Sequence, residues 1–67
     1  MIDSALIPKR LLRRQAVEDL TGLSRSSIYK QMSEGTFPHA VRISARAVAW
    51  DEARVLAWLA SRPSTQA

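Results

Sequence analysis

The residues best suited to bind a ligand lie in one short basic and hydroxyl-rich stretch that contains no carboxylate. Arginine can donate two hydrogen bonds to a guanine base, lysine suits phosphate, and serine hydroxyls and the first backbone amides of a helix also donate to anions. The chemistry offered is recognition of a polyanion, with nucleic acid as the first candidate. The stretch supplies the candidate contact residues Arg25, Ser26, Ser27, Tyr29 and Lys30.

Four further arginines are candidate contacts to a nucleic-acid backbone. Arg13 and Arg14 stand at the start of the first predicted helix. Arg42 and Arg46 fall on the outward face or at the tip of a predicted hairpin, a wing that can approach the DNA backbone or the minor groove. The alternative is a purely structural role, since charged residues on exposed strands occur for solubility alone. For Tyr29 the open alternatives are ligand contact and packing on the hairpin.

The sequence offers no support for catalysis. Four of the six acidic residues form two adjacent pairs, 18–19 and 51–52, and neighbours on a helix do not face one another. There is no cysteine and no Gly-rich phosphate loop, and one histidine, His39, cannot build a metal site alone. We expect neither an enzyme nor a cofactor or metal.

Chain length and net charge are consistent with a small protein that binds a polyanion. A chain of 67 residues has room for one core, so residues 1–67 are predicted to form a single domain, with 1–5 and 64–67 as flexible ends. Ten Lys and Arg against six Asp and Glu give a net charge of +4, an excess that attracts polyanions. No apolar run is long enough to cross a bilayer, so the expected location is the cytoplasm.

Apolar spacing predicts two helices close together, at about 14–21 and 25–34. Ala16, Val17 and Leu20 form a helical stripe, Gly22 suits a helix end, and Ser24 suits the cap of the next helix. Two short helices joined by a three-residue turn match the helix-turn-helix, whose second helix lies in the major groove of DNA.

Beyond Pro38 the apolar period changes from that of a helix to that of a strand. It predicts a hairpin with strands at about 40–44 and 47–50, followed by a third helix at about 51–61 that Asp51 caps. Trp50 and Trp58 are in register with apolar neighbours, so both are predicted to lie in the core. The fold class expected is α+β, mostly α, in the form of a small winged helix-turn-helix.

Several motifs together resemble the AlpA-type phage and prophage regulators, relatives of the excisionase and MerR-like winged helices. The resemblance covers roughly residues 10 to 63. Its motifs are 11–14, Val17, 20–30, 35–38, 41–43, 46–50, Val55 and 57–59.

This resemblance implies a DNA-binding winged helix-turn-helix without catalytic activity, in which residues 24–30 form the recognition helix and 42–46 the wing. Many relatives place glycine at the wing tip, where this chain has Ser44, Ala45 and Arg46.

The predicted function is sequence-specific binding of double-stranded DNA by a transcriptional regulator or an excisionase-like factor. A single module this small buries only about 600 to 1,000 Å² of its surface on DNA, so further copies on adjacent sites are expected to help. The alternative is a protein-interaction module that binds a recombinase or a response regulator through the same basic face. Single-stranded nucleic acid is less favoured because exposed aromatic residues are few.

Overall fold

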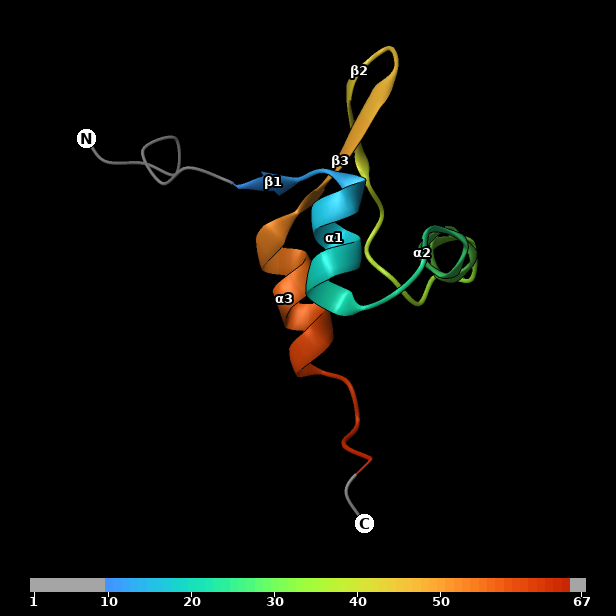
Figure 1. The fold of residues 1–67 in the computed structure, drawn as a ribbon, viewed down its shortest axis with the longest axis vertical. Helices are drawn as coiled ribbons and strands as arrows, with labels where there is room; N and C mark the ends of the chain where they lie inside the picture. Colours follow the sequence, from blue (N-terminus) through green and yellow to red (C-terminus); the bar gives the residue numbers. More distant parts are fainter. Residues whose placement is uncertain (1–9, 66–67) are drawn as a thin grey trace, which may run out of the picture.

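The predicted winged helix-turn-helix is confirmed by a computed structural model that describes residues 10–65 (Figure 1). The expected elements are all present, with ends that differ by at most one residue. Of the ends predicted to be flexible, 1–5 and 66–67 lie outside the described residues, and 64–65 carry neither helix nor strand. The elements are β1 (Leu11–Leu12), α1 (Arg14–Thr21), α2 (Arg25–Ser33), β2 (Val41–Ser44), β3 (Ala47–Asp51) and α3 (Glu52–Ala60).

The sheet has one strand more than the sequence predicted. Its three antiparallel strands run in the order β1-β3-β2, with Leu11 opposite Asp51 and Leu12 opposite Trp50. The Glu52 N–H donates to the Arg10 carbonyl at 2.9 Å, which continues the pairing by one step. A two-residue strand shows no alternation in the sequence, so β1 exists only through its contact with a strand far along the chain.

Local chemistry sets the helix ends, as the sequence indicated. Gly22 adopts a left-handed φ of 78° and its N–H donates to the Glu18 carbonyl, which ends α1. Ser24 Oγ accepts from the Ser27 N–H at 3.2 Å and begins α2.

The end of α2 is a Schellman motif around a second left-handed glycine. The Gly35 N–H donates to the Met32 carbonyl, and the Thr36 N–H donates to the Gln31 carbonyl. Gly35 therefore stops the helix, as predicted, and turns the chain towards the hairpin.

One core joins all three helices to the sheet. Its buried members come from β1, α1, α2, the α2–β2 loop, β3 and α3: Leu12, Val17, Ile28, Phe37, Trp50 and Val55. The predicted core position of Trp50 is confirmed, whereas Trp58 is only partly buried and packs against the edge of this cluster.

Some apolar residues that the periodicity placed in the core are exposed. Ala16 and Leu20 of the predicted α1 stripe are exposed, and only Val17 is fully buried. Val41 and Ile43 on β2 are each 46% exposed. Arg42 lies opposite Val48 on the sheet face that carries the core, so the neighbouring Val41 belongs to the other face, and Ile43 lies in the part of the hairpin that projects beyond the helices (Figure 1). The alternation was read correctly as a strand, but there is no layer for that part of the strand to pack against.

The two indole N–H groups hold the loop between α2 and β2. Trp50 Nε1 donates to the Pro38 carbonyl at 3.1 Å, and Trp58 Nε1 donates to the Thr36 carbonyl at 2.6 Å. Between these two carbonyls the Phe37 ring is buried, and it meets Trp58 edge-on with 4.8 Å between ring centroids. The loop is thus fixed at both sides of a core residue.

Replacing Trp50 by Ala is expected to lower the free energy of unfolding by about 3 to 5 kcal/mol, because it removes a fully buried ring and leaves a cavity. Urea denaturation followed by circular dichroism measures this loss. The matched control is Leu56→Ala on the 47% exposed Leu56, expected to change stability by only about 0.5 kcal/mol. Equal unfolding curves for the two variants would contradict the core described above.

Candidate nucleic-acid interface

The first turn of α2 is built on a cluster of serine hydroxyls. Ser24 Oγ, besides capping the helix, donates to Ser27 Oγ at 3.1 Å and lies 3.3 Å from Ser26 Oγ. The turn contains no acidic residue. Ser27 is therefore partly occupied in holding the helix start, while Ser26 is exposed to solvent.

The solvent side of α2 carries the other predicted contact residues. Arg25 and Lys30 are exposed, and Ile28 faces the core. The Arg25 guanidinium carbon lies 5.8 Å from the centroid of the Tyr29 ring, a cation–π distance. The Tyr29 ring in turn meets Trp50 edge-on at 6.2 Å and keeps 39% of its surface exposed. Tyr29 thus packs on the hairpin strand β3 and still faces solvent.

A hollow of about 320 Å³ brings together side chains that are far apart in the sequence. One wall is the start of α1, another is α2, and the third is the hairpin. Four of the predicted site residues share it: Arg13, Arg14, Tyr29 and Arg46. Gln15 and Val48 complete the lining. Gln15 and Val48 are not among the contact residues predicted from the sequence. For Val48 a signal existed, since alternation puts it on the same strand face as Arg46.

Arg46 stands at the tip of the hairpin, within the range that the sequence predicted, and lines this hollow, whereas Arg42 lies on the face of the strand that carries the core and not on the outward face. Arg42 lies opposite Val48, and Leu12 lies opposite Trp50, so these residues belong to the face of the sheet that also carries the core. The core stops short of the hairpin tip. Beyond the core, the same face of the sheet carries Arg42 and Arg46 in place of apolar residues. Both arginines remain exposed.

The tip of the hairpin forms without glycine and, among the described residues, without any non-glycine residue at positive φ. The register is irregular between Arg42 and Ser44, which leaves Ile43 as the extra residue of a bulge. Arg42 Nη1 donates to the Ala45 carbonyl at 3.1 Å. The side chain of Arg42 is therefore folded onto the tip, whereas Arg46 lines the hollow.

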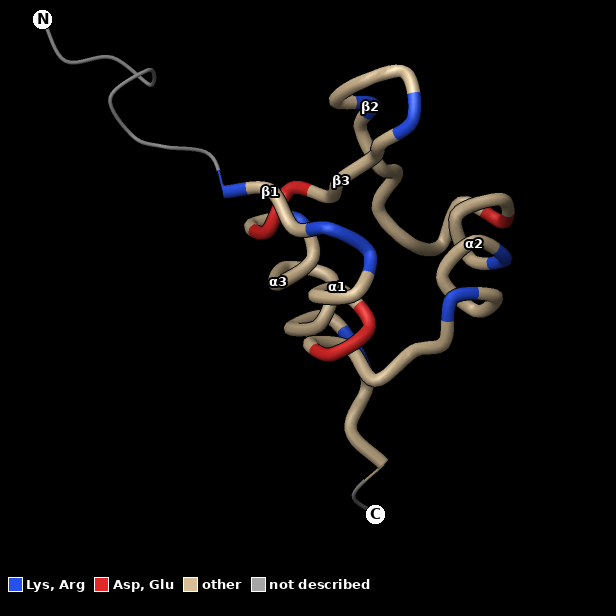
Figure 2. Tube along the Cα trace, turned by 45° about the horizontal axis from the view of Figure 1, so that its top comes forward, with Lys and Arg blue, Asp and Glu red and all other residues tan. Residues whose placement is uncertain are grey.

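Lys and Arg residues, blue along the chain trace in Figure 2, occur on α2, on the hairpin and at the start of α1. Arg14 is paired with Glu18 at 3.2 Å. Within residues 10–65, no ion pair involves Arg13, Arg25, Lys30, Arg42 or Arg46. The remaining ion pairs, Arg10 with Glu52 and Arg54 with Asp51, join β1 and β3 to α3.

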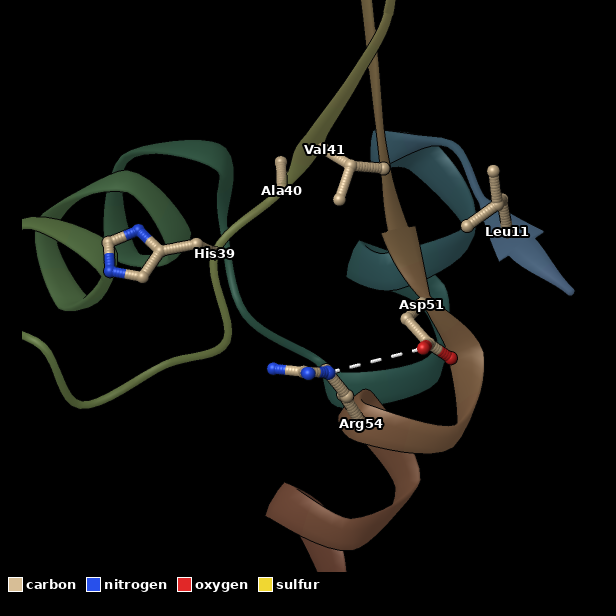
Figure 3. A pocket seen from close by; sticks show the side chains of 6 residues that line it. All are labelled: Leu11, His39, Ala40, Val41, Asp51 and Arg54. Atoms are coloured by element: carbon tan, nitrogen blue, oxygen red, sulfur yellow. Dashed lines mark ion pairs between the residues drawn. The ribbon is translucent and has the colours of Figure 1, made fainter. Parts of the chain in front are cut away.

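A second hollow, of about 360 Å³, contains His39 and lies on the other side of the sheet (Figure 3). Leu11 and Val41 line it from two strands, and the Asp51–Arg54 ion pair lines it from below in this view. In the described part of the chain, no group of three or more His, Cys, Asp and Glu side chains is placed to hold a metal ion. None of the described helices has the length and apolar character needed to span a membrane.

Comparison with known proteins identifies two relatives. The chain is 44% identical over 54 residues to a protein of Enterobacteria phage P4 described as uncharacterized protein ORF88; the alignment covers 81% of this chain and 61% of the phage protein. It is 34% identical over 59 residues to the DNA-binding transcriptional activator AlpA of Escherichia coli K12, covering 79% of this chain and 84% of that protein.

The resemblance noted in the sequence is confirmed by a match over residues 10–63 to the family described as prophage CP4-57 regulatory protein (AlpA). The matched residues include both helices of the helix-turn-helix, the hairpin and α3. The chain therefore belongs to the AlpA family of prophage regulatory proteins.

Proposed function

We propose that this protein binds a specific site on double-stranded DNA and acts in the cytoplasm as a transcriptional regulator or as a factor that directs prophage excision. The observation that carries the proposal is the cationic hollow, which joins arginines of α1 and of the hairpin beside the exposed face of α2. The description of the Escherichia coli relative as a DNA-binding transcriptional activator supports the same function.

In this proposal α2 enters the major groove and reads the bases. Arg25 is exposed near the start of the helix, where recognition helices contact base edges, and its guanidinium suits bidentate bonding to guanine. The neighbouring Ser26 hydroxyl is exposed as well. Tyr29 lies under Arg25 and limits the directions that the arginine can take.

The other cations bind the phosphates on both sides of that groove. Arg13 and Arg14 do so from α1, Lys30 from the outer side of α2, and Arg42 and Arg46 from the hairpin. Because the hairpin is held to the helices through β3 and Trp50, these contacts fix the orientation of α2 on the duplex. Further copies on adjacent sites, or a recombinase alongside, would supply specificity that one small module lacks.

DNA binding is expected to weaken steeply with salt. Release of counterions from about five phosphates predicts a slope near −4.5 in log K against log salt concentration, at roughly −0.9 per phosphate. Fluorescence anisotropy of a short labelled duplex at several salt concentrations measures this slope. A slope close to zero would be inconsistent with the proposed contacts. Binding to a protein partner that excess random duplex does not reduce would favour the alternative, a protein-interaction module.

Replacing Arg25 by Ala is expected to weaken binding to the protected DNA site by about 1 to 3 kcal/mol, because one base contact is lost. Footprinting on the surrounding DNA defines that site, and titration of the matching duplex gives the affinity. Arg54→Ala is the control with the same change of charge, since Arg54 lies on the other side of the sheet and pairs with Asp51. If a folded Arg25→Ala variant binds as tightly as the Arg54→Ala variant, Arg25 does not read a base.

A further inference from the structure

We propose that the hollow between α1, α2 and the hairpin holds one phosphate of the DNA backbone, bound jointly by Arg13, Arg46 and the Tyr29 hydroxyl. This inference rests on the proposed function. It adds the identity of the DNA group that occupies the hollow. It also assigns Tyr29 a contact in addition to its packing on Trp50.

The charge of the lining fits an anion. Three of the six lining residues are arginines and none carries a carboxylate. Arg14 is paired with Glu18, whereas within the described residues Arg13 and Arg46 have no ion pair. Two guanidinium groups on one hollow repel each other, and a single anion between them turns that repulsion into attraction. A phosphate is the group of DNA that carries this charge.

The backbone of α1 adds donors beside Arg13. The first intrahelical bond of α1 runs from the Val17 N–H to the Arg13 carbonyl, so the N–H groups of the residues before Val17 have no partner within the helix. Arg13 is the N-cap, and its side chain makes no capping bond. The residues at the start of the helix line the hollow, and a helix start of this kind favours an anion nearby.

Tyr29 brings a hydroxyl whose position is already determined. Its ring lies between Trp50, 6.2 Å away, and the Arg25 guanidinium, 5.8 Å away. Among residues 10–65 no hydrogen bond of the Tyr29 hydroxyl is found. A hydroxyl on a ring held by packing can donate to phosphate with little loss of side-chain freedom.

A shared phosphate has a measurable signature, because two residues that bind the same group do not act independently. We would compare Arg13→Ala, Arg46→Ala and the double variant by anisotropy on one random-sequence duplex. A phosphate that keeps one of its two arginines stays neutralised, so each single substitution is expected to change the salt slope little, whereas the double variant is expected to reduce it by about 0.9. In the reference pair, Arg13→Ala with Arg42→Ala, the losses of the two single variants are expected to add to about 0.9, all of it from Arg42, since Arg42 is folded onto the tip and contacts a different phosphate.

Tyr29→Phe provides a second test that leaves the ring packing intact. Loss of the hydroxyl is expected to weaken binding by about tenfold in the parent protein and to have almost no effect in the Arg13→Ala/Arg46→Ala background. Circular dichroism confirms folding of each variant, and Arg13→Gln replaces Arg13→Ala if the latter unfolds. Arg54→Ala again controls for the loss of one positive charge.

The outcomes separate this inference from the proposed function. If the parent protein does not bind duplex DNA, the proposed function fails. If the parent binds with a steep salt slope but the Arg13 and Arg46 losses simply add, or Tyr29→Phe binds like the parent, the function stands and the shared phosphate is wrong. Losses that do not add, together with the background-dependent effect of Tyr29→Phe, support the inference.

Discussion

The arrangement of the whole molecule depends on how two tryptophans hold the loop between α2 and β2. The indole of Trp50 binds the carbonyl of Pro38, and that of Trp58 binds the carbonyl of Thr36. Phe37, between them, is buried in the core. A loop bound on both sides of a buried ring has little freedom, and it is this loop that sets the position of α2 relative to the hairpin. The sequence has no cysteine, so these contacts constrain the loop where other small proteins use a disulfide.

Trp50 connects that constraint to the proposed DNA-binding side. Its strand, β3, is the centre of the sheet and pairs with both β1 and β2. One edge of its ring meets Tyr29, which in turn lies beneath Arg25. Further along the same sheet face come Val48 and the arginines of the hairpin. The core and the cationic surface are therefore two parts of one face of the sheet, and the site is rigid because its inner part is packed.

The parts of this structure that follow from neighbouring residues could be predicted, and those that follow from distant contacts could not. Gly22, Ser24, Gly35 and Asp51 mark helix ends through bonds within a few residues, and all four act where the sequence indicated. The strand β1 was missed because only its pairing with β3 makes it a strand. The exposure of Val41 could not be foreseen either, since alternation identifies a strand but not whether another layer covers it. Most of the candidate residues are exposed, but the meeting of four of them at one hollow depends on the packing of three segments. Their contacts with DNA remain predictions.

The hollow connects the stability of the fold with the proposed DNA binding, because both depend on the repulsion between its arginines. Bringing Arg13 and Arg46 to one place raises the electrostatic energy of the free protein, and a small core has little free energy to offset it. Salt screens this repulsion and so favours the folded free protein, while the same salt competes with the protein for the phosphates. In the proposed complex, a phosphate in the hollow removes the repulsion and joins α1, α2 and the hairpin through one more contact. The proposed binding to DNA would therefore stabilise the fold at the hollow, where Arg13 and Arg46 repel each other in the free protein.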